Sequence, residues 1–481
     1  MRISTVKNYI YNVLYQLLVI AAPLVTAPYL ASTLGADALG RYSYVCTVAS
    51  VVSTIGLLGL YSYGVRQIAY IGDDKKATSK LFWEVMLLRT ALLVLGVAVY
   101  AIVGVISQST MLFVTYLPWL IGMYFDISWV YVGKENMRIA VIKNAFAKIV
   151  TIVGIFVFVK DADDVWKYLA LVSFSVFVGN LSVWLAIKEY ISFKPIVKLG
   201  DCKGHLAGAL VLFLPQVATT IYLQVDKLML RWISGESAIA FYDQAEKLIN
   251  VPLTFITVLG TVMMPRIANE FKKGNKEEVS KLICSAKQFS TLSAIPLMLG
   301  ICGIAKNLIP WYLGEEFLPV INVIYFIAPI IIFNSYSSVF GAQYLTATDQ
   351  TKILTIACFS AAGVNLVINS ILIPFFAERG AAIATLIASL VSIVIQLSYI
   401  RKQITIKIFD VNFIKCLVAG AFMIGIVILM EFIKVHPILV TVLQILGGAT
   451  VYFIILAIVH EAFFINAFRL VLERLKWKKK S

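Results

Sequence analysis

Fourteen long apolar runs fill most of this 481-residue sequence and decide what it can fold into. They lie at roughly 8–34, 41–65, 81–106, 111–132, 139–159, 165–187, 205–232, 238–265, 282–305, 318–346, 353–375, 380–400, 412–433 and 437–460. Each run can cross the roughly 30 Å hydrocarbon layer of a bilayer as an α-helix that rises about 1.5 Å per residue. The runs are continuous and lack the alternation of a barrel strand. They therefore predict an all-α integral membrane protein of about fourteen transmembrane helices.

The composition also indicates that lipid surrounds the chain. Hydrophobic residues make up 60% of the chain and charged residues 14%, whereas an average soluble domain carries about 25% charged residues. The first run is longer than the roughly 7–15-residue apolar core of a cleaved signal peptide, so we expect it to remain as the first helix.

The distribution of lysine and arginine predicts the orientation. When the segments between spans are assigned to alternate sides, 29 of these residues lie on the side of the N-terminus and 7 on the opposite side. This asymmetry predicts that both termini are cytoplasmic. The same bias, with contacts to anionic lipid headgroups, accounts for the net charge of +15 without a nucleic-acid partner. Residues 461–481 mix basic and apolar side chains and predict an amphipathic helix on the inner leaflet.

An internal repeat with an offset of about 200 residues relates the first six spans to the next six. The matching pairs are Leu14 and Leu214, Gln16 and Gln216, Gly35 and Gly235, Ala38 and Ala238, Tyr42 and Tyr242, and Arg66 and Arg266. Six spans separate equivalent points, so both copies have the same orientation. We expect two parallel six-helix lobes, related by a pseudo-two-fold axis along the membrane normal, with a substrate site between them. The expected boundaries are 1–190 for the N-lobe, 204–402 for the C-lobe, 412–460 for two further helices and 461–481 for the tail.

Charged residues inside the spans are the first candidates for a functional site, because burying a charge in lipid is costly unless it is paired or faces water. Arg89 and Lys148 lie near the predicted midplane and are candidates for binding substrate in a cavity. Structural ion pairing with a residue such as Asp126 is the alternative. The candidates for a gate of ion pairs or for a coupling-ion site are Asp126, Asp226, Lys227, Asp243, Glu246 and Lys247. Static pairing is the alternative for these residues as well.

Polar side chains spaced by three or four residues give several spans a polar face. The candidates for substrate contacts on these faces are Asn12, Gln16, Gln216, Gln224 and Asn250. The alternative role is hydrogen bonding between helices, which such residues commonly provide in membrane bundles. Arg66 and Arg266 lie at predicted cytoplasmic ends, where they are candidates for headgroup binding or plain interfacial anchors.

No motif of an enzyme or of a bound cofactor is present. The sequence has no GxxxxGK[ST] loop and no CxxC pair, and its three histidines, His205, His436 and His460, fall at the ends of spans, which indicates interfacial positions. The longest loops have only about 15 residues, too few for a soluble catalytic domain. We therefore expect a transporter, not an enzyme, with no metal and no cofactor beyond a coupling H⁺ or Na⁺.

Several short segments resemble a known family when they are taken in order. They are residues 34–44, 63–69, 125–129, 225–230, 241–247 and 264–266, and they read LGADALGRYSY, YGVRQIA, FDISW, VDKLML, FYDQAEK and MPR. In this order, and with fourteen spans, the chain resembles the bacterial polysaccharide repeat-unit flippases, which translocate lipid-linked oligosaccharides. They belong to the multidrug/oligosaccharidyl-lipid/polysaccharide exporter superfamily. The resemblance covers roughly residues 8–270 and includes both predicted lobes.

The resemblance implies two six-helix lobes around a cationic cavity and two further C-terminal helices. It implies that an undecaprenyl-pyrophosphate-linked oligosaccharide, for capsule, O-antigen or a teichoic-acid-like polymer, crosses to the outer leaflet by alternating access, coupled to an ion or to the membrane potential. It also implies a location in the bacterial cytoplasmic membrane, near polymerase and other envelope-biosynthesis proteins. Arg89 and Lys148 are suited to this substrate because a pyrophosphate requires basic groups in a wet cavity.

Two other functions stay open. The first helix lacks an acidic residue, in which the chain departs from the cation-coupled drug exporters of the same superfamily. A cation-coupled multidrug antiporter is therefore the first alternative. An integral-membrane polymerase or ligase of lipid-linked glycans is the second, although such enzymes usually need a large external loop, which this sequence lacks.

Overall fold

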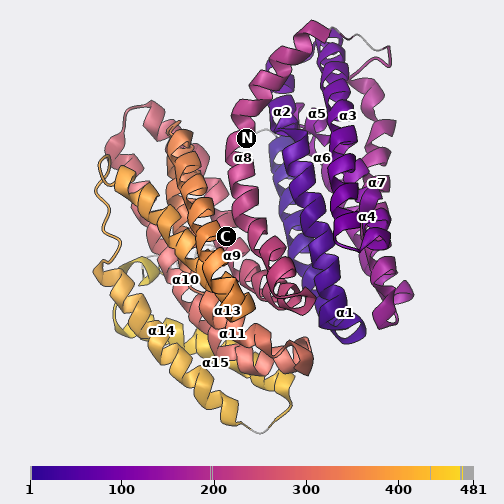
Figure 1. Ribbon diagram of the computed structural model, residues 1–481. Helices are drawn as coiled ribbons and strands as arrows, with labels where there is room; N and C mark the ends of the chain where they lie inside the picture. The colour runs from indigo at the N-terminus through magenta and orange to yellow at the C-terminus, as the bar shows by residue number, and fades with distance from the viewer. Residues whose placement is uncertain (1–2, 195–196, 198, 434, 466–468, 470–481) are drawn as a thin grey trace. The chain divides into compact units, whose positions relative to one another are not determined.

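The computed structural model describes residues 3–194, 197, 199–433, 435–465 and 469, except for the side chains of residues 3–20 and of a few other helical positions. Most of the predicted tail, 461–481, therefore lies outside the described residues. The chain divides into two compact units, Met1–Ala240 and Phe241–Ser481. Helices fill both units (Figure 1).

Long helices build the first unit. They are α1 (Ile3–Leu57), α2 (Leu60–Ile71), α3 (Lys75–Ile106), α4 (Thr110–Tyr124), α5 (Ser128–Gly133), α6 (Met137–Phe158), α7 (Val165–Ser182) and α8 (Leu199–Ile233). Helix α4 packs along α7, and α6 packs against both α7 and α1. Helix α8 packs against α1, α2 and α3, so the start of the second repeat lies on the first.

The first predicted span and most of the second lie on one bent element, α1, whose course depends on two glycines. Gly35 has φ 74° and ψ 177°, a backbone conformation that glycine adopts without the steric penalty of a Cβ atom. Gly40 lies against the next repeat, because a Cβ atom placed there would overlap the carbonyl group of Glu236. The kink and this close backbone contact therefore both depend on the missing side chain.

The second unit repeats the long-helix pattern. Helix α9 (Glu236–Lys272) begins in the last residues of the first unit. The elements that follow are α10 (Lys276–Tyr312), α11 (Pro319–Ile327), α12 (Ile330–Ser337), a π-helical turn (Ser338–Leu345), α13 (Thr351–Ile400), α14 (Val411–Leu429) and α15 (Pro437–Ile458). Helix α13 is interrupted at Ala377, with φ 48° and ψ −126°, so it contains two predicted spans.

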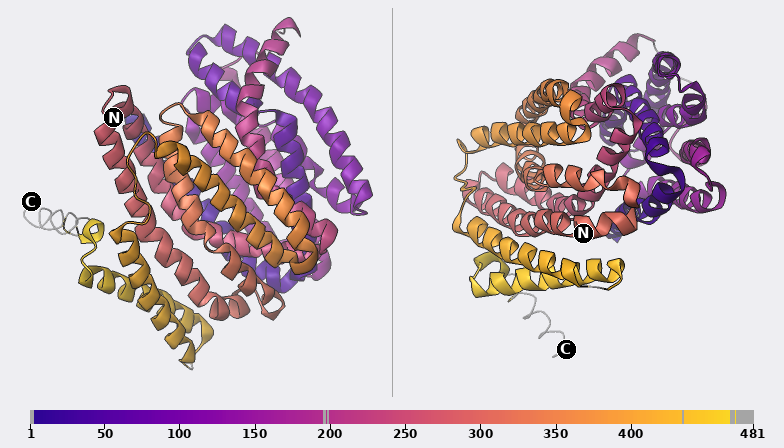
Figure 2. Two further views of the ribbon diagram at one scale, coloured as in Figure 1. Left: turned by 60° about the vertical axis from the view of Figure 1, so that its left-hand side comes forward. Right: turned by 60° about the horizontal axis from the view of Figure 1, so that its bottom comes forward.

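Helices α14 and α15 form a pair that packs along α10 (Figure 2). Hydrogen bonds join the pair to α10, from Asn307 Nδ2 to Gln444 Oε1 at 3.2 Å and from Tyr452 Oη to the carbonyl oxygen of Leu292 at 2.9 Å. Both bonds come from α15 and lie about four turns apart on α10, and α14 packs on α10 as well. The two helices outside the repeat therefore form one body with α10.

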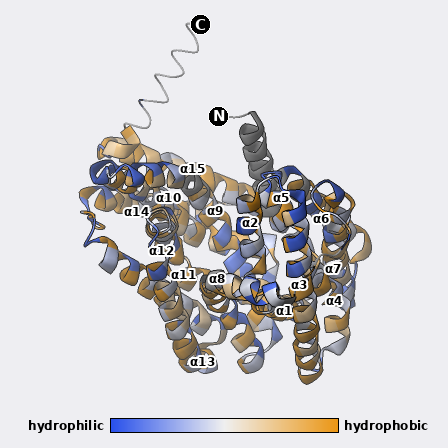
Figure 3. Cartoon of the chain, turned by 90° about the horizontal axis from the view of Figure 1, so that it is seen from above, coloured by the Kyte–Doolittle hydropathy of each residue, from blue (hydrophilic) through white to orange (hydrophobic). Residues whose placement is uncertain are grey.

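The helices present the apolar surface that a bilayer requires. Within the described residues, eight helices are long and apolar enough to cross a membrane, or ten if each of two bent pairs is one span. The other four predicted spans fall on the first part of α1, on α8, on α9 and on the second part of α13. Apolar residues run along the helices of both units (Figure 3), and side chains such as Val94 and Leu446 are more than 60% exposed. Such surface is expected to face lipid.

Candidate functional site

The fourth predicted span is broken about two thirds of the way along it. Helix α4 ends at Tyr124 and α5 begins at Ser128, so residues 125–127 interrupt the helical hydrogen bonds. The last carbonyl groups of a helix have no partner within that helix, and inside a membrane the protein must supply one. Broken helices of this kind often contribute to the binding sites of transporters. The break between α4 and α5 is therefore the centre of the candidate site.

Arg89 of α3 binds two of the freed carbonyl groups. Its Nη1 donates to the carbonyl oxygen of Asp126 and its Nη2 to that of Met123, both at 2.7 Å. The guanidinium suits this position because its planar fork presents several donors in a fixed geometry. Arg89 is 1% exposed, and its Nε atom is buried without a hydrogen bond among the described residues.

The helix α7 and the turn after it bind two further carbonyl groups. Asn180 Nδ2 donates to the carbonyl oxygen of Gly122, and Trp184 Nε1 donates to that of Phe125, each at 2.9 Å. The backbone at the break is thus bound from α3 on one side and from α7 on the other. These contacts fix the break to two neighbouring helices.

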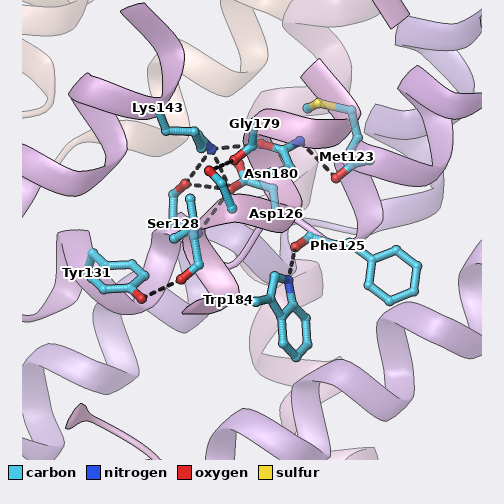
Figure 4. Close-up of polar contacts among 12 residues, drawn as sticks. Met123, Phe125, Asp126, Ser128, Tyr131, Lys143, Gly179, Asn180 and Trp184 are labelled. Carbon is cyan, nitrogen blue, oxygen red and sulfur yellow. Dashed lines mark hydrogen bonds and ion pairs between the residues drawn. The ribbon is translucent and has the colours of Figure 1, made fainter. Parts of the chain in front are cut away.

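Lys143 of α6 is the centre of a buried polar network beside the break (Figure 4). Its Nζ atom donates to Asp126 Oδ1 at 2.9 Å, to Ser128 Oγ at 2.7 Å and to Asn180 Oδ1 at 2.7 Å. The side chain of Lys143 is 4% exposed and that of Asp126 17%. The Asp126 carboxylate also accepts from the Ser128 backbone N–H at 3.0 Å, at the start of α5. The network is referred to below as the Lys143 network.

The charges at the break do not cancel. Arg89 and Lys143 contribute two positive charges and Asp126 one negative charge, whereas Ser128 and Asn180 are neutral. One positive charge of the three groups is thus balanced only by carbonyl dipoles. A buried site with this balance attracts an anion more strongly than a cation.

Arg89 contacts Asp126 as a hydrogen-bond donor to its backbone carbonyl group and not as its ion-pair partner. The Asp126 carboxylate is paired with Lys143 instead. Lys148 is half-buried on α6, five residues beyond Lys143. Five residues correspond to a rotation of about 140° around a helix, so these two lysines lie on different faces of α6.

The other candidates for gating or ion coupling lie on α8 and α9. Asp226 and Lys227 of α8 are 1% and 8% exposed. On α9, Lys247 Nζ and Asp243 Oδ2 form an ion pair at 2.7 Å, and Glu246 is half-buried. The predicted ion pairing is thus present on α9, and its role in gating stays a prediction.

The polar candidates for substrate contacts differ in exposure. Gln216 and Asn250 are exposed and Gln224 is half-buried, whereas the side chains of Asn12 and Gln16 lie outside the described part of the chain. At the predicted cytoplasmic ends, Arg66 is exposed. Arg266 is exposed as well, with its Nη2 atom 3.3 Å from Glu278 Oε1.

The sequence interpretation missed a cluster at the start of α9. Glu236 forms ion pairs with Arg41 at 3.3 Å and with Arg231 at 3.0 Å. Ser237 Oγ donates to Asp37 Oδ1 at 2.8 Å. Positions 37 and 237 are equivalent under the 200-residue repeat, so this bond joins matching points of the two copies. The offset itself was a signal that could have drawn attention to these polar residues.

A second missed cluster lies in the second unit. Tyr242 Oη and Thr385 Oγ1 are 2.9 Å apart, and Asn369 Nδ2 donates to Asn365 Oδ1 at 3.0 Å. Both asparagines are 0% exposed. The spacing of four residues between two asparagines in an apolar span was the available signal. Within the described residues, no group of three or more His, Cys, Asp and Glu side chains could hold a metal ion.

Known proteins are similar to this chain in sequence and in fold. Residues 5–271 match the family described as "Polysaccharide biosynthesis protein". A protein of Escherichia coli (strain K12) that is named as an O-antigen transporter is 22% identical over 417 residues, which are 84% of this chain and 98% of the relative.

Two solved structures show the fold. The lipid II flippase MurJ in an inward closed conformation has a TM-score of 0.76 and 17% identity, covering 95% of this chain and 99% of its own. An inward-facing multidrug transporter of the MATE family has a TM-score of 0.59 and 13% identity, covering 86% of this chain and 95% of its own. The similarity to both covers most of each chain, which confirms the predicted all-α, two-lobe fold class.

Proposed function

Because the chain belongs to the polysaccharide biosynthesis protein family, we propose that it carries an undecaprenyl-pyrophosphate-linked oligosaccharide from the inner to the outer leaflet of a membrane. The chain is a multi-pass membrane transporter, not an enzyme, and its relatives support a flippase for lipid-linked oligosaccharides. The finer assignment is to a repeat unit of capsule, O-antigen or a teichoic-acid-like polymer, moved by alternating access.

One observation carries the proposal most: the similarity extends over almost whole chains. The Escherichia coli relative is covered to 98% of its length and MurJ to 99%. The charge at the α4–α5 break is in keeping with an anionic substrate. A pyrophosphate needs charge-assisted hydrogen bonds when it leaves water, and arginine provides them in a forked geometry.

Arg89 and Lys148 are the residues that we propose for the pyrophosphate. In this structure each Nη atom of Arg89 uses one N–H on a carbonyl oxygen, so Nε–H and one further N–H on each Nη atom are the donors that we propose for the substrate. Lys148 is half-buried on α6. The proposed contacts for sugar hydroxyls are Asn12, Gln16, Gln216, Gln224 and Asn250.

The remaining roles follow the same proposal. Arg66 and Arg266 would bind the headgroup at the cytoplasmic side, and ion pairs such as Asp243–Lys247 would contribute to a gate. We place the protein in the bacterial cytoplasmic membrane with both termini in the cytoplasm, in contact with anionic lipids and with polymerase. The lobe boundaries at 190 and 204, and coupling to H⁺, Na⁺ or the membrane potential, belong to the proposal as well.

The test is a deletion strain together with purified protein in liposomes. The strain should accumulate undecaprenyl-linked repeat units on the cytoplasmic side, and the liposomes should expose a labelled lipid-linked oligosaccharide on the opposite leaflet. Efflux of a dye under an ion gradient without flipping would instead favour the multidrug antiporter. Longer glycan chains on the lipid carrier would favour a polymerase or ligase.

A further inference from the structure

The first turns of α8 are attached to α2 and α3 through a histidine that bridges two elements. His205 Nε2 lies 2.9 Å from Glu84 Oε2 of α3, and His205 Nδ1 lies 2.8 Å from Tyr63 Oη of α2. The Glu84 side chain is 2% exposed and that of His205 16%. The sequence had indicated only an interfacial position for this histidine.

Charged groups surround this contact on every element packed against it. Lys80 of α3 is paired with Asp201 of α8, and its Nζ atom is 3.8 Å from Glu84 Oε1. The groups that face the pair are Tyr63 and Arg66 on α2, Lys80 on α3, and Asp201 and Cys202 on α8. Arg66 is exposed, so water screens its charge. Lys80 lies near both Asp201 and Glu84, and the Glu84 carboxylate is the charged group in hydrogen-bond contact with the imidazole.

The hydrogen bonds define where protons are held. An ionised carboxylate only accepts, so the Nε2 atom of His205 must donate to Glu84. In the neutral imidazole, Nδ1 then accepts from the Tyr63 hydroxyl. Binding of one proton at Nδ1 makes the ring a cation, so Nε2–H then donates from a cation to an anion and Coulomb attraction is added to the hydrogen bond. The Tyr63 oxygen then accepts from Nδ1–H, and its own hydrogen turns to another acceptor.

We propose that Glu84 and His205 form a proton-binding site that fastens the start of α8 to α3. Uptake of a proton strengthens the attachment, and release of the proton weakens it. Histidine is suited to this role because its charge changes near neutral pH. Helix α8 opens the second repeat, so the site would couple proton binding to movement of the repeats during flipping. This last consequence alone rests on the proposed function.

Cys202 provides a direct readout of the attachment. It lies on α8 three residues before His205 and is 7% exposed, so loosening of this end of α8 would open it to a maleimide. We would measure its alkylation rate in the full chain in nanodiscs, by peptide mass spectrometry, for wild type, His205→Gln and Lys203→Gln. The glutamine keeps a neutral donor toward Glu84, and Lys203 is an exposed neighbour that serves as control. Alkylation rates are compared between variant and wild type at the same pH, because the rate of any thiol depends on pH.

At pH 6 we expect Cys202 to react about fivefold faster in His205→Gln than in wild type, and at pH 8 the two rates should agree within about twofold. Lys203→Gln should match wild type at both. If the ratio of the Cys202 alkylation rates in His205→Gln and in wild type is the same at pH 6 and pH 8, the proposal is overturned.

A second measurement avoids dependence on that variant. The alkylation rate of Cys202 in Glu84→Gln, which removes the anion and keeps the histidine, should also exceed the wild-type rate at pH 6, and a rate equal to wild type would refute the site. Neither readout needs transport, so a protein that flips no glycan would fail the proposed function and leave this test intact.

Discussion

Replacement of Lys143 by methionine is the most direct test of the buried charge at the α4–α5 break. Lys143→Met removes three hydrogen bonds, of 2.9, 2.7 and 2.7 Å, from a side chain that is 4% exposed. The methionine fills a similar volume. The Asp126 carboxylate then loses its cation and keeps only the contacts from Ser128. Removing one partner of a buried ion pair typically costs roughly 3–5 kcal/mol, because the other charge remains buried.

The assay is thermal unfolding of the purified protein in nanodiscs. A loss of 1 kcal/mol lowers Tm by about 2–4 °C in a unit of 150–250 residues, so Lys143→Met should lower it by roughly 6–20 °C. The double variant Lys143→Met/Asp126→Asn removes both charges and should recover at least about half of the loss. Lys281→Met is the control, because its ion pair with Glu277 is exposed and screened by water, so its loss should change Tm little.

Two results would refute this reasoning. A Tm for Lys143→Met within about 2 °C of the Lys281→Met control would show that the ion pair at Asp126 is not buried as described. A double variant less stable than Lys143→Met would show that the cost comes from lost packing and not from an uncompensated carboxylate. Either result would also remove the basis for treating the break as a preorganised, positively charged site.

Three further predictions concern other contacts of the chain. Gly40→Ala should sharply reduce flipping and lower Tm, because the new Cβ atom overlaps a backbone carbonyl group. Gly363→Ala is the control, because no atom lies within 4 Å of its new Cβ atom, and it should leave flipping and Tm unchanged. Equal effects of the two substitutions would contradict the close approach at Gly40. Arg89→Lys should destabilise by about 1–3 kcal/mol in thermal unfolding, since one ammonium cannot reproduce both 2.7 Å bonds, and an unchanged Tm would argue against them. Lys287→Met should cost roughly 3–5 kcal/mol and increase protease cleavage before α14, because it breaks the 2.7 Å pair with Asp410; unchanged cleavage would mean that this pair does not hold α14.

The spans were predictable because lipid imposes a simple rule on the sequence. Each of the fourteen predicted runs falls on helix, including the two that share α13 on either side of Ala377. Length and apolarity suffice for this result, since a spanning segment must satisfy its own backbone. The 200-residue offset likewise predicted a two-lobe fold, because equivalent residues such as Gly35 and Gly235 recur at fixed spacing.

The break between α4 and α5 could not be read from its own residues. Asp126 and Ser128 give only a local signal there, and the interruption also depends on donors from distant segments: Arg89, Asn180 and Trp184. Periodicity describes only the helix to which a residue belongs. Hydrogen bonds from residues that are distant in the sequence determine where a helix can be interrupted without leaving buried backbone groups unpaired.

Lys143 shows the limit of sequence reasoning about charge. The tally of 29 basic residues against 7 counts it on the cytoplasmic side, six residues into α6, where a lysine commonly extends toward the interface. The structure instead buries it against Asp126. Without Lys143 the tally is 28 against 7, so the predicted orientation does not depend on this residue. One misplaced lysine does not change an orientation that is predicted from many loops. It does change the prediction of a site that contains only three charges. The same sequence can therefore predict orientation firmly and leave the identity of the buried cation to the structure.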